Sequence, residues 1–358
     1  MADRLARSIL LLPLALCLQG PAAMAATDAR PVYREIGDWL LACDNLRNCV
    51  ARAARDPAAA PVAGDDAEVR MDIARDSGPN GAVTVRLQAE HRIDPTSIHI
   101  GTRPLPRDLP WRIGGDRQDA SLTGEPARRF VRAIVDAPAL MLARAGPAQI
   151  SLRGLAAVLL AMDEAQGRVG NASALVRPGS GPADLTPPPM LPPRIRVGPP
   201  APALADAQRL ARAVRRGQAT IIAAHECDRS SDDDAAYPLT RTEAIVVLGC
   251  GRFAYQTSVL LFRTPRDRPA AATLLTLPDP PAARPTDAAS AGEYVEGDYD
   301  PATRTFVEVS KGRGMADCGS ATEWTFDGTA FRVSAFRWQD RCAGTTPGEW
   351  PVLYQTRR

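Results

Sequence analysis

Apolar and polar residues alternate with a period of two along several short stretches of this chain, the pattern of β-strands that bury one face. In the first half we expect strands at 38–43, 49–53, 68–73 and 83–87, a hairpin turn at 77–81, and weaker strands at 98–100, 111–113 and 139–143. In the second half the expected strands form antiparallel pairs: 243–251 with 255–262, 294–299 with 305–309, and 323–326 with 331–338. The alternation predicts a chain dominated by antiparallel sheet.

Three other stretches have helical spacing of apolar residues. One covers 126–135, and a second covers 151–166 with Ser151 as its expected N-cap. The third covers 204–216, and we expect its outer basic face to be solvated: Arg209, Arg212, Arg215 and Arg216. The predicted fold class is therefore α+β and β-rich. It combines a small N-terminal α+β domain with a C-terminal antiparallel β-meander, as a twisted sheet or partly closed barrel, covered by the third helix.

A proline-rich segment separates the two halves. Residues 178–202 contain ten of the 33 prolines of the chain, a composition that favours extended polyproline geometry over helix or sheet. We therefore expect a domain at 31–177, a stiff linker at 178–203 and a second domain at 204–358.

The N-terminus has the three parts of a secretory signal: Arg4 and Arg7, an apolar run at 9–18, and a stretch of small residues ending at Ala25. We expect cleavage after Ala25, with cleavage after Ala26 as the alternative. A lipoprotein signal at Cys17 is disfavoured because the preceding residue, Leu16, is not small. The expected location is periplasmic, and no apolar run is long enough for a transmembrane segment.

Charge and cysteine usage narrow the picture further. The net charge of +2 argues against a nucleic-acid partner, which normally requires a strongly basic surface. Outside the signal there are six cysteines, and an even number in an exported chain indicates disulfides rather than free thiols. Because each sequence-neighbouring pair falls within one local β unit, we expect these bonds: Cys43–Cys49, Cys227–Cys250 and Cys318–Cys342.

Candidate catalytic and metal-binding residues are sparse. His225, Glu226, Cys227 and Asp228 precede an acidic run at 232–234, but neighbouring side chains on a strand alternate faces, so a solvated loop is favoured over zinc or calcium. The turn at 298–303 is favoured over a cation loop because strands flank it on both sides. His91, His99 and His225 are candidate bases for a hydrolase, but no Gly-x-Ser-x-Gly motif indicates a nucleophile. We therefore expect no catalytic residue, cofactor or metal.

One glycine-rich loop, 312–319, is a candidate ligand site. Arg313 has the donor geometry to bind a carboxylate or phosphate, and Asp317 lies four residues further on. The alternative is structural, with Arg313 paired to Asp317 or capping backbone carbonyls near the disulfide.

Two parts of the chain resemble a known family. The segment 151–170 with 174–176, and a C-terminal set that includes Asp300-Pro301, Gly312-Arg313-Gly314, Asp317-Cys318-Gly319 and Trp350, resemble the proteobacterial family of unknown function numbered 1176. The opening pattern Asp38-Trp39 with Cys43 and Cys49 is also similar to the invasion-associated locus B family. These resemblances imply a periplasmic or envelope location, but no reaction, substrate or catalytic residue.

The sequence therefore favours a non-enzymatic binding module of the envelope, whose partner is an unknown envelope protein or glycan. The alternative is an envelope hydrolase that uses dispersed residues.

Overall fold

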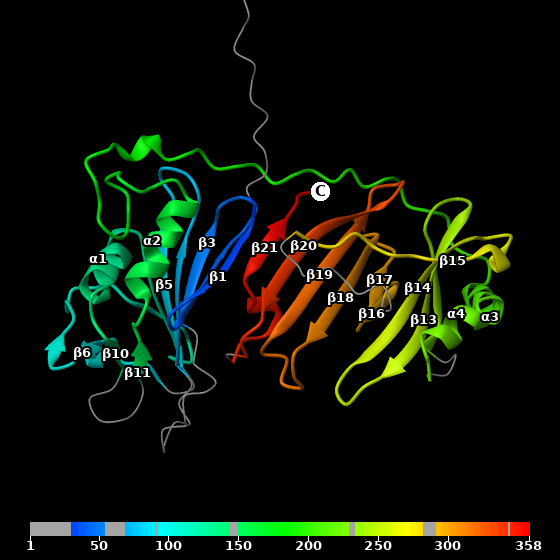
Figure 1. Cartoon of the computed structure of the whole chain (residues 1–358), viewed down its shortest axis with the longest axis horizontal. Helices are drawn as coiled ribbons and strands as arrows, with labels where there is room; N and C mark the ends of the chain where they lie inside the picture. Colours follow the sequence, from blue (N-terminus) through cyan, green and yellow to red (C-terminus); the bar gives the residue numbers. More distant parts are fainter. Residues whose placement is uncertain are drawn as a thin grey trace, which may run out of the picture.

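The computed structural model describes residues 30–53, 69–89, 92–142, 149–228, 233–281, 291–342 and 344–358. The fold is β-rich α+β, as predicted, and its named strands pair in antiparallel sheets (Figure 1). Among these residues, no helix has both the length and the apolar character needed to cross a membrane. The signal region, with Cys17 and the cleavage position at Ala25, lies outside the described residues.

The first half contains an antiparallel sheet covered by two helices. Its strands, in spatial order, are β1 (Val32–Ile36), β2 (Trp39–Cys43), β3 (Cys49–Ala53), β4 (Val69–Arg75), β5 (Val83–Ala89), β9 (Asp119–Thr123) and β8 (Arg112–Ile113). The helices α1 (Glu125–Ile134) and α2 (Leu155–Ala165) pack on one face, and the shared core includes Trp39, Met71, Phe130 and Leu159. The expected hairpin and both helices are therefore present.

A second, smaller sheet shows that the predicted start of the second helix is wrong. It consists of β11 (Gln149–Ser151), β10 (Ala139–Met141), β6 (His99–Ile100) and β7 (Arg103–Pro104). Ser151 ends a strand here, and its hydroxyl donates a hydrogen bond to Asp38 Oδ2 at 2.6 Å rather than capping the helix. The helix starts at Leu155, because Gly154 with a φ of 93° reverses the chain just before it.

The second half contains two antiparallel meanders that face each other. One consists of β12 (Ala235–Pro238), β13 (Glu243–Arg252), β14 (Thr257–Pro265), β15 (Thr273–Leu274) and β16 (Glu293–Val295). The other consists of β17 (Asp298–Asp300), β18 (Thr305–Lys311), β19 (Gly319–Phe326), β20 (Phe331–Gln339) and β21 (Val352–Gln355). Their facing sides bury an aromatic-rich core that includes Tyr294, Phe306 and Trp324.

Helices cover the outer face of the β12–β16 sheet. Leu210 and Val214 of α3 (Ala207–Gly217) pack on it, as expected, and α4 (Ala219–Ala224) follows directly. Short 3-10 turns occur at Pro95–Ser97, Ala183–Leu185, Pro269–Ala271 and Pro347–Glu349.

The expected continuous strand at 294–299 is wrong, because the chain changes sheets within it. β16 pairs with β14, whereas β17 pairs with β18. Between these strands Glu296 has a positive φ of 48°, and Gly297 lies against the ring of Phe306. This turn converts what the alternation predicts as one hairpin into the link between two facing sheets.

The two halves are in direct contact. Ala42 of the first half is buried with Phe336 and Leu353 of the second, and the Tyr33 ring stacks on Trp338 with centroids 4.4 Å apart. Arg52 of the first half also donates hydrogen bonds to two residues of the second half, to Gln339 Oε1 at 2.9 Å and to the Glu349 carbonyl at 3.1 Å.

The proline-rich segment runs along one edge of the molecule, between the two halves (Figure 1). Ile195 and Pro193 form backbone hydrogen bonds of 2.9 and 2.8 Å with Arg357, and Arg304 Nη1 donates to the Pro199 carbonyl at 2.8 Å. The segment is thus attached to the second half over 193–199, whereas its earlier part is attached to the first half, where the Gly179 amide donates to the Asn171 carbonyl at 3.1 Å and Asn171 Nδ2 donates to Thr186 Oγ1 at 3.0 Å.

Three disulfides are present: Cys43–Cys49, Cys227–Cys250 and Cys318–Cys342. The first joins β2 to β3, the second joins the chain after α4 to β13, and the third joins the chain before β19 to the chain after β20. Each bond is local, so it fixes one turn of the fold rather than linking the two halves.

Candidate functional site

A pocket of about 430 Å³ lies over the face of the β17–β21 sheet that faces β16. Its floor is made by cross-strand pairs. Glu308 of β18 pairs with Thr322 of β19, which in turn pairs with Phe336 of β20, and Ser320 pairs with Trp338 one step along. Strand pleating therefore places one acid, two hydroxyls and two aromatic rings on a single surface.

Two buried aromatic side chains hold the opposite wall in place. Trp324 Nε1 donates a hydrogen bond to the Pro278 carbonyl at 2.8 Å. The Tyr294 hydroxyl donates to the Leu275 carbonyl at 3.1 Å and accepts from the Leu277 amide at 2.7 Å. These bonds fix residues 275–279 beside the floor, and the rings of Tyr294 and Trp324 meet edge to face.

The first half supports one end of the pocket. The Tyr33 hydroxyl donates to Asp340 Oδ1 at 2.6 Å and accepts from the Asp340 amide at 3.0 Å, while its ring stacks on Trp338. Asp340 and Trp338 both line the pocket, so the contact between the halves also positions two of its side chains.

Four acidic residues border this space: Asp279, Glu293, Glu308 and Asp340. The carboxylate of Glu293 lies on the helix-covered face of its own sheet, because Glu293 pairs with Leu260 there and bonds to Ser258 and His225. None of the described residues that line it is a lysine or an arginine. The acidic groups therefore give the pocket a negative potential, which low-dielectric walls concentrate.

Glu308 is the most perturbed of these acids. Burial raises its pKa to about 7, and the hydrogen bond that Oε1 accepts from the Val295 amide at 3.0 Å offsets this rise only in part. Within the described part of the chain, no ion pair to Glu308 is formed. A half-buried acid with no cation beside it, in a pocket, is the kind of group that marks functional sites.

Glu293 has a different environment. Its Oε1 accepts a hydrogen bond of 2.5 Å from the Ser258 hydroxyl, and its Oε2 lies 3.4 Å from His225 Nδ1. Ser258 is buried, and its oxygen also accepts the Gly251 amide at 2.8 Å. Because this hydroxyl is enclosed and used twice, Ser258 acts as a structural bridge rather than as an exposed nucleophile.

In the 312–319 loop, which was predicted to bind an anion, Arg313 forms an ion pair with Asp317 of the same loop. Arg313 Nε donates to Asp317 Oδ1 at 2.7 Å, a second bond joins Nη2 to Oδ2, and the pKa of Asp317 is lowered by this guanidinium. Asp317 is buried and also accepts the Gly344 amide. This is the structural alternative weighed above, and anion binding by Arg313 stays a prediction that would have to compete with Asp317.

The other candidates are not brought together. His99 lies on β6 with Nδ1 2.7 Å from the Ser97 carbonyl, whereas His225 follows α4, and His91 lies outside the described residues, as does Asp232. Cys227 is in a disulfide, and Asp234 is buried against Arg215 at 2.5 Å. At 298–303, Asp300 accepts the Ala302 amide at 2.8 Å and closes a turn between strands.

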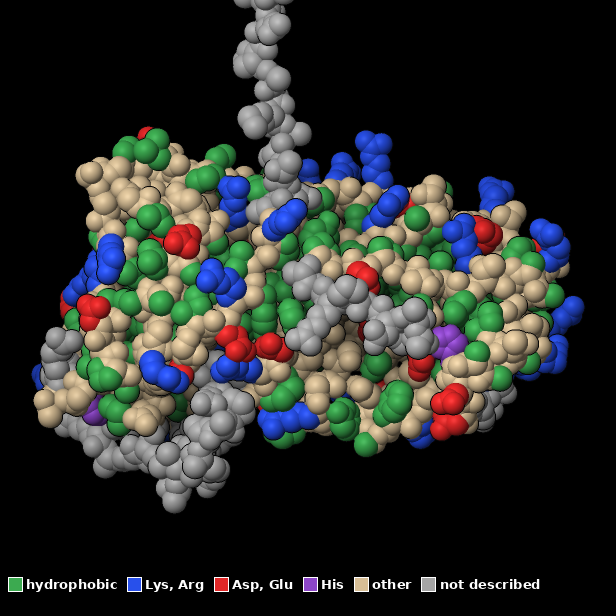
Figure 2. All heavy atoms as spheres, in the orientation of Figure 1, with side chains coloured by type: hydrophobic (Ala, Val, Ile, Leu, Met, Phe, Trp, Pro, Cys, Tyr) green, Lys and Arg blue, Asp and Glu red, His purple; other side chains and the backbone are tan. Residues whose placement is uncertain are grey.

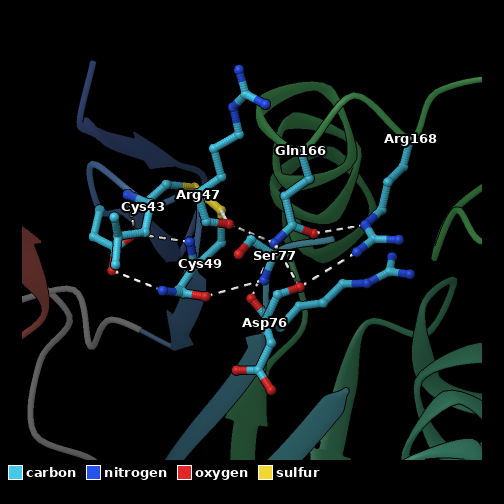
Figure 3. The surroundings of a disulfide bond; sticks show 11 residues. Cys43, Arg47, Cys49, Asp76, Ser77, Gln166 and Arg168 are labelled. Carbon is cyan, nitrogen blue, oxygen red and sulfur yellow. Dashed lines mark hydrogen bonds between the residues drawn. A yellow bond between two sulfur atoms is a disulfide. The ribbon is translucent and has the colours of Figure 1, made fainter. Parts of the chain in front are cut away.

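The residues that carried the family resemblance near α2 have a structural role. Gln166, after the end of α2, donates to the carbonyls of Arg47, Arg75 and Asp76, and Arg168 contacts Gln166 and the Gly78 carbonyl (Figure 3). These bonds tie the helix end to the turn closed by Cys43–Cys49 and to the β4–β5 turn. The motif therefore maintains the fold of the first half rather than a site.

Sequence reasoning missed the pocket, although one signal for Glu308 was present. In the strand that begins at Thr305, Glu308 has the same parity as the buried Phe306, so the alternation places a carboxylate on the inner face. The walls had no comparable signal, because Tyr294, Trp324 and Asp340 come from separate strands and loops.

Comparisons with known proteins identify a family and a relative but no activity. A family model described as "Protein of unknown function (DUF1176)" matches residues 33–357. The chain is similar to a protein of Escherichia coli (strain K12) described as "Uncharacterized protein YpfG", with 27% identity over 339 residues that cover 92% of this chain and 94% of the relative. No solved structure matches. The likeness to the invasion-associated locus B family stays a prediction, whereas the chain belongs to the family of proteins of unknown function DUF1176.

Proposed function

We propose that this chain is an exported envelope protein, cleaved after Ala25, that binds a small organic molecule carrying a protonated amine in the pocket over Glu308. The observation that carries the proposal is the half-buried carboxylate of Glu308, which has no described cation beside it. A ligand ammonium group would supply that charge and would gain further attraction from the faces of aromatic rings.

The remaining lining supports the same ligand class. Asp279 and Asp340 add negative charge, whereas a bound carboxylate or phosphate would face three acids. A neutral glycan, which the sequence left open, would use the aromatic rings and hydroxyls but would leave Glu308 without a counter-charge. The geometry therefore favours an amine over a sugar.

The proposal predicts a specific pH dependence. Because the pKa of Glu308 is about 7, its ionised fraction increases roughly tenfold between pH 6 and pH 8. The affinity for an amine that stays protonated over this range should increase by about the same factor. Titration calorimetry with putrescine, spermidine and choline at both pH values measures it, with N-acetylglucosamine as the neutral comparison.

Two variants make the test specific. Glu308→Gln should weaken amine binding about tenfold or more at pH 8 and should flatten the pH dependence. Glu323→Gln, on the neighbouring strand but not in the pocket lining, should leave both unchanged. Binding of N-acetylglucosamine but of none of the amines would favour the glycan, and amine binding that is equally strong in Glu308→Gln and in native protein would reject the site.

A hydrolase is the second candidate because His225 Nδ1 lies 3.4 Å from Glu293 Oε2, and Glu293 is one of the residues that border the pocket. A hydrolytic activity of purified protein that is lost in His225→Ala but kept in His99→Ala would support it. Absence of any hydrolytic activity in native protein would leave binding as the function, whereas activity kept in both variants would exclude His225 as its base.

A further inference from the structure

Three exposed hydrophobic side chains lie on two neighbouring turns of the second half. Phe253 and Tyr255, in the turn between β13 and β14, are 54% and 43% exposed, and Met315, in the turn between β18 and β19, is 73% exposed. We call these three side chains the apolar tip. Both turns lie at the same end of the sheets, at the lower edge of the view in Figure 1.

The two turns hold each other in position. The Tyr255 hydroxyl donates a hydrogen bond to the Gly312 carbonyl at 3.2 Å, and Lys311 Nζ donates to the Tyr255 carbonyl at 3.3 Å. The Lys311 amide also donates to Gln256 Oε1 at 3.1 Å. The turns belong to different sheets, so these bonds present the apolar tip as one preformed surface rather than as two independent loops.

The two turns of the apolar tip also contain basic residues. Arg252, Lys311 and Arg313 belong to the same two turns, and the carboxylate of Asp317 is the one acid within 252–256 and 311–318. Within these two turns, three cations and one carboxylate leave a net charge of +2, and one further carboxylate, that of Glu296, accepts the adjacent Thr257 amide at 2.6 Å. Figure 2 shows hydrophobic and basic side chains along this lower edge, with acidic side chains beside them towards the right.

We propose that the apolar tip docks on an anionic phospholipid surface. Aromatic rings and a methionine that project from convex turns can enter the headgroup region of a bilayer, and the basic residues beside them attract anionic headgroups. A protein partner fits less well, because three projecting side chains offer far less than the roughly 800 Å² that each partner buries in a stable interface. The contact is peripheral and reversible, since few side chains insert.

The experiment is flotation of the protein with vesicles. The chain is purified from the cells that produce it, its N-terminus is read by intact mass, and it is mixed with vesicles of phosphatidylglycerol and phosphatidylcholine or of phosphatidylcholine alone. We expect binding to the anionic vesicles and at least tenfold weaker partition onto the neutral ones. Raising the salt concentration should reduce the binding because exposed charges are screened.

Substitutions in the apolar tip test whether it binds the vesicles. Phe253→Ser with Met315→Ser should lower partition onto anionic vesicles about tenfold or more, and Met315→Ser alone gives a smaller loss without touching the core. Leu185→Ser with Leu191→Ser removes two side chains that are 70% and 74% exposed elsewhere, and this control should bind as the native protein does. Arg252→Gln with Lys311→Gln should weaken only the anionic binding, whereas Arg209→Gln with Arg212→Gln on α3 should not.

Circular dichroism confirms that each variant is folded. The proposal is wrong if native protein does not float with anionic vesicles, or if the tip variants float as well as the two controls. Loss of a co-purifying protein from the tip variants, with vesicle binding unchanged, would identify the tip as a protein interface and would equally reject lipid docking.

Discussion

At the scale of single residues, the buried carboxylate of Glu308 lowers the stability of the fold when it is ionised, and it also offers a charge that a ligand can bind. Its carboxylate sits on the inner face of β18 in the row with Thr322 and Phe336, where strand geometry would normally place an apolar side chain. Burying an ionised acid without a cation is unfavourable, which is why its pKa is raised to about 7. A residue of this kind lowers stability unless something binds to it.

The unfavourable burial of the ionised Glu308 carboxylate predicts how the free energy of unfolding depends on pH. The pKa of Glu308 is about 7 in the folded state and near 4.5 in the unfolded chain, so the folded protein binds more protons between these values. The stabilisation is complete below about pH 4.5 and is lost as the pH rises through 7. Between pH 5 and pH 8, native protein should therefore lose about 2–3 kcal/mol more unfolding free energy than Glu308→Gln does.

Urea unfolding of both proteins at pH 5 and pH 8 measures this difference. The two should be of similar stability at pH 5, and the variant should be the more stable at pH 8. Every other titratable group is common to both proteins, so the comparison isolates Glu308. Parallel pH profiles for the two proteins would show that the carboxylate is not held in the way described.

At the scale of elements, local pattern was sufficient where each strand pairs with its neighbour in sequence. The hairpins β2–β3, β4–β5, β13–β14 and β19–β20 follow from alternation and turn residues, and α1 and α3 follow from helical spacing. Errors occurred where a contact distant in sequence, or a single turn residue, decides the outcome. Ser151 donates its hydroxyl hydrogen bond to Asp38 and ends a strand instead of capping the helix. The turn at Glu296 separates β16 from β17, and the two strands pair in different sheets.

The candidate site was harder to predict for the same reason. A pocket is a property of surfaces that meet, and its wall depends on bonds such as Trp324 to Pro278, which are 46 residues apart. Sequence reasoning looked for compact clusters, such as His225 to Asp228 or Arg313 with Asp317. The structure uses those residues for a disulfide and for local ion pairs, while Glu308 was visible only as a break in one strand's alternation.

The end of α2 offers a test at this scale. Asp163 is fully buried, pairs with Arg75 Nη1 at 3.1 Å and accepts the Leu175 amide at 2.8 Å, so it joins the helix to β4 and to the following loop. Asp163→Asn should cost about 3–5 kcal/mol of unfolding free energy, because it leaves the buried Arg75 charge without its counter-ion. Chemical denaturation measures the loss.

The matched control is Asp108→Asn, which removes the aspartate of an exposed ion pair with Arg129 in the same half. It should leave the unfolding midpoint nearly unchanged, since solvent already screens that pair. If both substitutions had similar effects, the buried pair would not be anchoring the helix.

At the scale of the whole molecule, the two halves behave as parts of one structure. Arg52 bonds across to Gln339, Asn45 donates its backbone amide to the Leu353 carbonyl at 3.1 Å, and Tyr33 holds Asp340 at the pocket. The outer face of the first sheet is therefore covered by the second half, and the pocket is shaped by both. A change at this contact should affect the stability of both halves and the site at once.

Leu353→Ala tests this coupling. Leu353 is fully buried with Ala42 and Phe336 at the contact, so the substitution should cost about 2–4 kcal/mol. Trp39 and Trp111 report on the first half, and Trp324, Trp338 and Trp350 report on the second. Thermal unfolding should remain a single transition at lower temperature by tryptophan fluorescence and by near-ultraviolet circular dichroism. The coupling is contradicted if native protein unfolds in two separated transitions, or if only the second half melts earlier in the variant. Either result would show that the halves fold independently and that the pocket does not depend on the first half.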